Sequence, residues 1–375
     1  MAEPTRVAVL GAGSWGTTFA KILTDAGCHV TLWARRPELA REINEVKRNS
    51  DYLSGVNLPR DLTATDRMDH ALAGAQQVFV SVPSQSLRAN LPSIGASLED
   101  DAVIVSLMKG VEKDTNLRMS EVIHRVLDLD PDRIAVVSGP NLALEIAKEQ
   151  PTAAVVSSTS VDTATAVARS ATNGYFHSFI NSDVVGTEFG GVLKNLIAVA
   201  IGIVDGVGYG ENTKASIITR GLVEMTDFAV AYGAESQTLM GLAGLGDLIA
   251  TCESPLSRNN TAGRLLGQGY SFSDVVKHMN QTAEGLASVG PVLHLARERD
   301  VAMPIVWQVS QVLAGALDPK DIAPHLTTTN QPQGEGTLGE RISDDETRHD
   351  RTSFWGAFKR TFHQLRDGSR SSERD

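Results

Sequence analysis

The chain has 375 residues, of which 42% are hydrophobic and 21% charged, and its formal net charge is −11. This length predicts two domains and a tail, and the composition is that of a soluble globular protein with a large core. The negative charge, without any basic stripe, argues against nucleic acid as a partner. With only Cys28 and Cys252, and no stretch like a signal peptide or membrane span, we expect a cytoplasmic protein without disulfides.

A glycine pattern stands between an apolar strand and a helix near the start of the chain. Residues 6–10 predict the strand, residues 14–26 predict the helix, and Gly11, Gly13 and Gly16 have the spacing Gly-x-Gly-x-x-Gly. In dinucleotide-binding folds the first glycine makes a tight turn, the second admits a pyrophosphate, and the third lets helix and strand pack closely. The helix N-terminus adds free N–H groups. An ordinary glycine-rich turn is the alternative, but the position favours a dinucleotide site.

The predicted second strand, residues 28–34, ends at Arg35 and Arg36. An Asp or Glu about twenty residues after the glycines usually holds the ribose of NAD. Here no carboxylate precedes Glu38. Two guanidinium groups at this position can pair with the 2′-phosphate of NADP. We therefore predict that NADP(H) is the preferred cofactor, with NAD(H) also possible; a solvated basic turn is the alternative.

Short apolar strands then alternate with helical segments. The segments are a helix over 37–48 and strands over 77–82, 102–106 and 134–138. This alternation predicts an α/β fold with a doubly wound, Rossmann-type parallel sheet in residues 1–183. Ligands bind at the carboxyl ends of such strands. Lys109 and Gly139 each follow a predicted strand at that edge.

The pattern becomes helical from residue 184. Residues 187–204 carry apolar side chains at helical spacing, and no convincing strand follows before about residue 317. We predict an all-helical domain over 184–325, with the active site in the cleft between the two domains.

Residues 326–375 are polar and are predicted to be a disordered tail. Apolar side chains recur there at helical spacing, beside three basic ones. They are Phe354, Trp355, Phe358, Phe362 and Leu365, with Lys359, Arg360 and Arg366. This layout is typical of a short amphipathic helix that contacts an anionic membrane weakly, or that docks on the protein itself or on a partner subunit.

Lys194 is the leading candidate for a catalytic residue. Gly190 and Gly191 lie one helical turn before it and Ala198 one turn after it, which leaves a dent where a ligand or another segment can approach. A lysine on a solvated face does not need helix-weakening glycines. A desolvated lysine can exchange a proton near neutral pH. The alternative is a surface lysine with its ammonium in water.

Two polar segments follow that suit a phosphorylated substrate. Asp247 comes after the glycine-rich residues 241–246 and is either a helix cap or a catalytic carboxylate. Residues 257–259, Ser-Arg-Asn, suit a phosphate monoester but also fit a polar loop. Lys109 and Glu284 are weaker candidates. The histidines show no metal-ligand spacing, and no Ser/His/Asp set can be assembled, so we predict no metal.

Together these blocks resemble bacterial-type NAD(P)-dependent sn-glycerol-3-phosphate dehydrogenase over residues 5–320. The matching blocks are Gly11 to Gly16, Lys109-Gly110, Gly139-Pro140-Asn141, Leu193-Lys194-Asn195, Gly241 to Asp247, Ser257-Arg258-Asn259 and Glu284-Gly285. Several such blocks in the right order are specific. The chain departs from the family pattern at Ser54 and Asn141, and its tail has no counterpart.

The resemblance implies reversible reduction of dihydroxyacetone phosphate to sn-glycerol 3-phosphate, which supplies glycerophospholipid synthesis. It implies cofactor contacts from Ser14, Trp15, Arg35, Arg36, Lys109, Ala143, Arg258, Thr282 and Glu284. It implies substrate contacts from Lys109, Gly139, Asn141, Lys194, Asp247, Ser257, Arg258 and Asn259. Lys194 is the expected proton acceptor, Asp247 orients it or the substrate, and we expect a homodimer. The alternatives are a reductase of a related 3-hydroxy acid and a non-catalytic NADP(H)-sensing protein.

Overall fold

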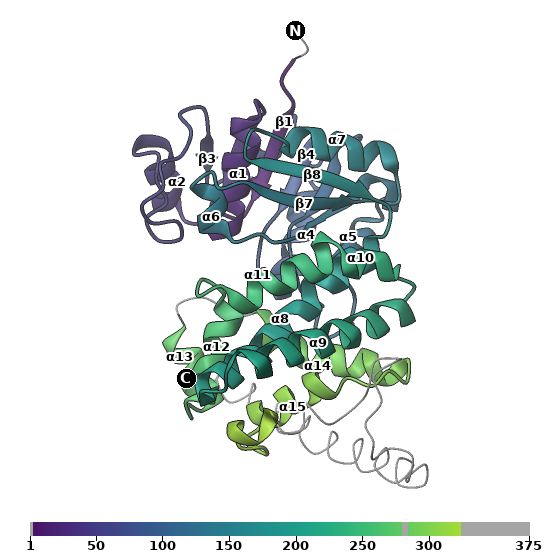
Figure 1. The fold of residues 1–375 in the computed structure, drawn as a ribbon. Coiled ribbons are helices and arrows are strands. Elements are labelled where there is room, and N and C mark those ends of the chain that lie inside the picture. Colours follow the sequence, from purple (N-terminus) through teal and green to yellow (C-terminus); the bar gives the residue numbers. More distant parts are fainter. Residues whose placement is uncertain (1–2, 280–283, 324–375) are drawn as a thin grey trace.

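The computed structural model describes residues 3–279 and 284–323. A sheet flanked by helices forms one half of the molecule, and a helical bundle forms the other (Figure 1). Every strand of the described chain precedes residue 182. The predicted fold class, a Rossmann-type sheet followed by a helical region, is therefore confirmed. The predicted tail and its amphipathic helix lie outside the described residues.

The sheet has eight strands in the order β3-β2-β1-β4-β5-β6-β7-β8. The strands are β1 (Arg6–Leu10), β2 (His29–Trp33), β3 (Thr63–Thr65), β4 (Gln77–Val80), β5 (Val103–Ser106), β6 (Ile134–Ser138), β7 (Thr152–Ser157) and β8 (Phe176–Asn181). The order reverses between β1 and β4, which is where ligands bind on doubly wound sheets. The five predicted strands, β1, β2, β4, β5 and β6, pair in parallel, and the one antiparallel pair in the described chain is β6 with β7, a strand that the sequence did not predict. The chain leaves β6 at the carboxyl edge, where α6 (Ala143–Ala147) packs against α1, and enters β7 from that same edge.

Helices cover both faces of the sheet. They are α1 (Ser14–Asp25), α2 (Pro37–Glu45), α3 (Met68–Leu72), α4 (Leu87–Gly95), α5 (Met119–Leu127) and α7 (Val161–Ala171), besides α6. Alternate residues of β1 enter two different apolar clusters: Val7 and Val9 pack with residues of α1 and α7, whereas Ala8 and Leu10 pack with residues of α3, α4 and α5. Burial on both faces explains the near-continuous apolar runs that made these strands predictable.

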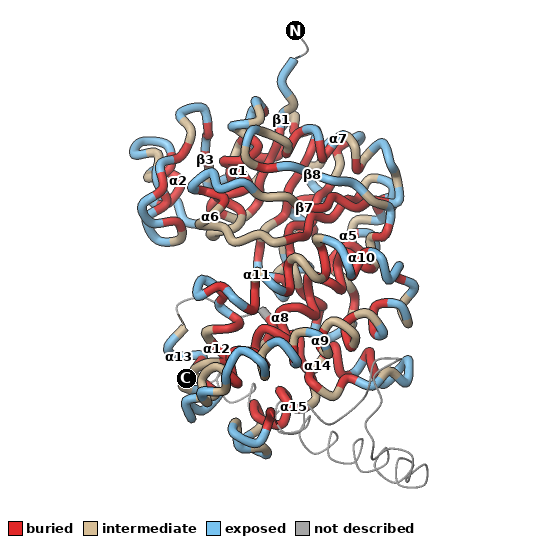
Figure 2. Tube along the Cα trace, in the orientation of Figure 1, coloured by how far each residue is buried: buried red, intermediate tan, exposed pale blue. Residues whose placement is uncertain are grey.

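The helical half is built around α8 (Val184–Val207). Its other helices are α9 (Glu211–Ala231), α10 (Ser236–Met240), α11 (Asp247–Glu253), α12 (Arg258–Gly267), α13 (Phe272–His278), α14 (Glu284–Glu298) and α15 (Pro304–Leu313). α8 is long and apolar enough to cross a membrane, but 83% of its most apolar window is buried in the protein (Figure 2). α12 packs tightly on it, because Gly202 and Gly263 let the two backbones approach: a Cβ at either would lie 2.1 Å from a carbonyl oxygen of the other helix.

Candidate active site

A cleft of about 1030 Å³ lies between the carboxyl edge of the sheet and the helical half. From the sheet half it is lined by Gly11, Gly13, Ser14, Trp15, Arg35, Arg36, Lys109, Asn141 and Ala143. From the helical half it is lined by Lys194, Asp247, Ser257, Arg258 and Asn259. Thr282 lies outside the described residues, and Glu284 is the first residue of α14. The structure thus brings most of the predicted site residues into one cavity.

The glycine turn leaves open space at one of its three glycines. A Cβ on Gly11, whose φ is +116°, would lie 2.4 Å from the carbonyl oxygen of Ser81, and one on Gly16 would lie 1.9 Å from that of Gly11. A Cβ on Gly13 would meet nothing within 4 Å. Gly13 is also the N-cap of α1 and no side chain caps that helix. The turn and the helix N-terminus therefore leave room and N–H donors for a pyrophosphate.

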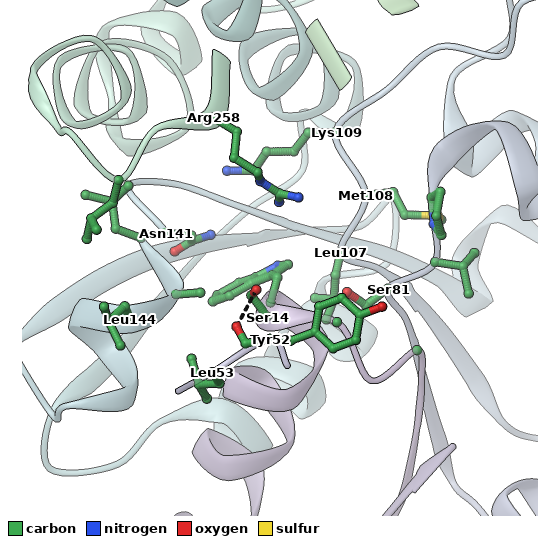
Figure 3. Close-up of a pocket in the computed structure, with 18 of the residues that line it drawn as sticks. Ser14, Tyr52, Leu53, Ser81, Leu107, Met108, Lys109, Asn141, Leu144 and Arg258 are labelled. Carbon is green, nitrogen blue, oxygen red and sulfur yellow. Dashed lines mark hydrogen bonds between the residues drawn. The ribbon is translucent and has the colours of Figure 1, made fainter. Parts of the chain in front are cut away.

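A buried asparagine that the sequence did not single out holds this turn. Asn49 is fully buried, and its Nδ2 donates to the carbonyl of Ala12 at 3.0 Å and to Thr17 Oγ1 at 2.8 Å. Its Oδ1 accepts from the Tyr52 amide at 3.2 Å. Ser14 Oγ donates to the Tyr52 carbonyl at 2.7 Å (Figure 3). These bonds tie the loop of residues 49–55 to the predicted pyrophosphate site.

The two arginines after β2 differ in their contacts. Arg35 is exposed and makes no hydrogen bond or ion pair to another described residue. Arg36 Nη2 lies 2.6 Å from Asp51 Oδ2, and its guanidinium lies 5.7 Å from the centre of the Tyr52 ring. The hydrogen bond to Asp51 raises the pKa of Arg36 above its usual value. Both arginines line the cleft at the place where a Rossmann fold binds the adenosine ribose.

Two lysines share one buried carboxylate deeper in the cleft. Lys109 Nζ donates to Asp247 Oδ2 at 2.5 Å and to the Gly139 carbonyl at 3.0 Å. Lys194 Nζ lies 3.0 Å from Asp247 Oδ1 and donates to Thr251 Oγ1 at 2.6 Å. The side chains of Asp247 and Lys194 are 2% and 9% exposed. Lys194 is therefore not a surface lysine, and that alternative is wrong.

The small residues beside Lys194 make this cluster possible. A Cβ on Gly190 would lie 2.4 Å from the Ala243 carbonyl oxygen, and one on Gly191 would lie 3.2 Å from Lys109 Cγ. The predicted dent on α8 is thus filled by the turn before α11 and by Lys109. Asp247 makes no capping bond; Gly246 is the N-cap of α11. Plain capping, the other interpretation of this aspartate, is therefore wrong.

Thr251 was not among the predicted site residues. It lies one turn after Asp247 on α11, and its hydroxyl donates to Asp247 Oδ1 at 3.2 Å while it accepts from Lys194. The spacing of four residues from a candidate carboxylate is a signal that could have found it, because such pairs lie on one helix face.

The N-terminus of α12 faces the same cleft. Ser257 is its N-cap and accepts from the Asn260 amide at 3.2 Å, and Arg258 is its first residue. Arg258 and Lys109 lie on one side of the cleft, opposite Ser14 (Figure 3). The Asn259 carboxamide donates to Asn195 Oδ1 at 2.8 Å and accepts from the Gly285 amide at 3.1 Å. This side chain therefore links α8 to α14, besides lining the cleft.

Several buried polar atoms of the cleft have no hydrogen-bond partner within the described chain. They are Trp15 Nε1 and both side-chain polar atoms of Asn141. Buried polar groups are normally hydrogen-bonded, so each of these suits a bound ligand. Together with the open space at Gly13, they fit a nicotinamide dinucleotide.

Comparison with known proteins agrees with this geometry. The family models for the N-terminus and the C-terminus of NAD-dependent glycerol-3-phosphate dehydrogenase match residues 6–164 and 183–324. The chain belongs to this family. Members of it include a protein of Leifsonia xyli named glycerol-3-phosphate dehydrogenase [NAD(P)+], which is 74% identical over 98% of this chain and all of its own length.

Two further members of the family resemble this chain, one in sequence and the other in both sequence and structure. A protein of the same name from Streptomyces griseus is 52% identical over 84% of this chain and 93% of its own length. Glycerol-3-phosphate dehydrogenase from Coxiella burnetii, known from a crystal structure, is 33% identical in sequence to this chain. The two structures superpose with a TM-score of 0.82, and the match covers 87% of this chain and 99% of the other.

Proposed function

We propose that this dehydrogenase reduces dihydroxyacetone phosphate reversibly to sn-glycerol 3-phosphate with NAD(P)H, and so supplies glycerophospholipid synthesis. The observation that carries the proposal is the pair of lysines on the buried Asp247, in one cleft with the glycine turn. A bound nicotinamide cofactor supplies the hydride. The chain's own residues orient the ketone, donate a proton to its oxygen during reduction and bind its phosphate.

Lys194 is the proposed proton donor in reduction and acceptor in oxidation. An ammonium has three N–H donors. One is donated to Thr251 Oγ1, and the ammonium lies 3.0 Å from Asp247 Oδ1 in an ion pair. Asp247 and Thr251 therefore hold the ammonium in place, and a remaining N–H is the proposed donor to the substrate oxygen. A proton held at this oxygen stabilises the alkoxide that forms when the hydride arrives.

The charge of the cluster favours the same step. Two ammonium groups around one carboxylate give a net charge of +1, and the three side chains are at most 14% exposed. Preorganised positive charge of this kind stabilises a developing oxyanion more strongly than water does. Lys109 contributes to this charge from the sheet half, and its bond to Gly139 holds it there.

The proposed phosphate site is the N-terminus of α12. Arg258 lies at the first helical position, where its guanidinium adds to the positive end of the helix. Ser257, Asn259, Gly139 and Asn141 complete the proposed substrate contacts. The alternative substrate, a related 3-hydroxy acid, would place a carboxylate here rather than a phosphate dianion.

The cofactor assignment extends along the opposite wall. Gly11, Gly13, Ser14, Trp15 and Gly16 are proposed cofactor-binding residues, and Gly13 is the one that admits the pyrophosphate. Arg35 and Arg36 are the proposed partners of a 2′-phosphate, so NADP(H) is preferred over NAD(H). Further proposed contacts are Lys109, Ala143, Arg258, Thr282 and Glu284.

The proposed domains follow the two halves of the fold. Residues 1–183 are the proposed cofactor domain, residues 184–325 the substrate domain and residues 326–375 the tail. We further propose a cytoplasmic homodimer without a nucleic-acid partner, and a weak membrane contact through the tail. Both cysteines are free and buried, as a reducing compartment allows.

One assay tests the function. Loss of NADPH absorbance should require dihydroxyacetone phosphate, and 3-oxo acids and unphosphorylated dihydroxyacetone should react far more slowly. Substituting NADH in the same assay measures the cofactor preference. Rapid turnover of a 3-oxo acid, or cofactor binding without turnover of any of these carbonyl compounds, would contradict the proposal.

A further inference from the structure

Asp51 stands beside the arginine that is proposed to recognise the 2′-phosphate. Its carboxylate lies 2.6 Å from the Arg36 guanidinium. In a Rossmann fold the end of the second strand contacts the adenosine ribose. A 2′-phosphate at that ribose would approach Arg36 from the cleft that Arg36 lines, and the guanidinium already has a carboxylate partner in Asp51.

The backbone around Asp51 is fixed to the rest of the site. Asn49, two residues before it, is fully buried and bonded to the glycine turn. Tyr52, directly after it, accepts a hydrogen bond from Ser14 and packs under the Arg36 guanidinium. The backbone of Asp51 is therefore held beside the proposed adenosine site, where its carboxylate pairs with Arg36.

We propose that Asp51 is a specificity-determining residue that weakens the binding of NADP(H) relative to NAD(H). Its carboxylate holds Arg36 in an ion pair that the 2′-phosphate must displace. NAD(H) carries a hydroxyl at this position, so it binds without displacing this ion pair. This proposal rests on the proposed function only in placing the adenosine ribose at Arg36.

The exposure of the pair limits the size of the effect. The side chains of Arg36 and Asp51 are 48% and 55% exposed, so water and salt screen their attraction. Removing the carboxylate should therefore strengthen NADPH binding by roughly three- to tenfold. The gain should shrink as the salt concentration rises.

The test is the dissociation constant of each cofactor, measured by NADPH and NADH fluorescence without substrate. Asp51→Asn should lower the constant for NADPH and leave that for NADH within about twofold. Asp61→Asn is the matched control, because it removes an exposed carboxylate from the same segment that has no ion-pair partner among the described residues. It should change neither constant.

A second variant separates the mechanism from a general charge effect. In an Arg36→Gln background, Asp51→Asn should lose most of its benefit for NADPH. An undiminished gain in that background, equal gains for both cofactors, or a matching gain in Asp61→Asn would each overturn the proposal. Because the dissociation constants are measured without turnover, they can be interpreted even if the protein does not catalyse the proposed reaction.

Discussion

Lys194 and Asp247 come from helices that are far apart in the sequence and meet in the cleft. Changing Lys194 to Ala removes the proposed proton donor and leaves Asp247 paired with Lys109. We expect the turnover number to fall by roughly a hundredfold or more, as loss of a general acid typically does. The dissociation constant for NADPH should hardly change.

Steady-state kinetics and cofactor fluorescence measure the two effects separately. Lys148→Ala removes an exposed lysine outside the cleft and serves as the control. Near-normal turnover of Lys194→Ala would show that this lysine has a structural role only.

Arg258 is the residue on which phosphate recognition should depend most. Arg258→Ala should raise the Michaelis constant for dihydroxyacetone phosphate, with a penalty on the order of 2–5 kcal/mol for a lost charge pair. Any slow reaction of unphosphorylated dihydroxyacetone should be almost insensitive to the change. A proportional loss of both activities would instead place Arg258 in cofactor binding or folding.

Individual residues differ in how far the sequence could assign them. Lys194 was predictable because the glycines that admit its neighbours lie on its own helix. Asn49 and Asp51 were not, because their partners, Ala12 and Arg36, are brought to them only by the path of the loop. Local spacing carries no signal for such contacts.

At the scale of elements, a buried carboxylate joins α9 to α15. Glu224 accepts hydrogen bonds from the amides of Ile305 and Val306 at 2.9 and 3.1 Å. Burial raises the pKa of Glu224 to about 8, against the opposing effect of these two bonds. In the unfolded chain the pKa of a glutamate is about 4.3.

This difference predicts how stability depends on pH. Between about pH 4.3 and pH 8 the folded chain binds a proton at Glu224 that the unfolded chain does not. Its contribution to the free energy of unfolding is therefore complete below this window and is lost as the pH rises through it. The free energy of unfolding of the wild type should therefore fall across this window. In Glu224→Gln the fall should be smaller by roughly 1–3 kcal/mol.

Denaturant unfolding of the wild type and Glu224→Gln at several pH values between about 5 and 8 gives the two slopes. Glu45→Gln changes an exposed glutamate and should keep the wild-type slope. Parallel curves for the wild type and Glu224→Gln would contradict the prediction.

The strands that the sequence did not predict give weaker signals than the others. β3 has three residues, and β7 carries two small alanines after Thr152, which indicate a strand only weakly although the last four residues of β7 are buried. β8 is an edge strand with Phe179 and Ile180 exposed, so it shows no alternation between a buried and a solvated face. β1, β4, β5 and β6 were predictable because both of their faces are buried, whereas β2 alternates between buried residues and exposed or half-buried ones.

At the scale of the whole molecule, the comparisons separate the catalytic body from the tail. The alignment with the Leifsonia xyli protein covers 98% of this chain, whereas that with the Streptomyces griseus protein covers 84%. The family models end at residue 324, so neither of them includes the tail. The cleft, by contrast, needs both matched regions, because its lysines come from opposite halves.

Deleting residues 326–375 should therefore leave catalysis intact. Every proposed site residue lies upstream of the deletion, so the turnover number and both Michaelis constants should stay within about twofold of the wild type. A large fall in activity would show that the tail contributes to the cleft or to its stability.

Sedimentation with anionic vesicles then tests the proposed membrane contact of the tail. The full chain should sediment in part, because apolar burial and basic side chains both favour an anionic surface, and the binding should weaken in high salt. The truncated chain should stay in the supernatant, as should a full-length Trp355→Glu/Phe358→Glu variant that keeps the basic residues. If all three chains remain equally in solution, the tail does not bind membranes, and docking on the protein or on a partner subunit becomes the explanation for its apolar face.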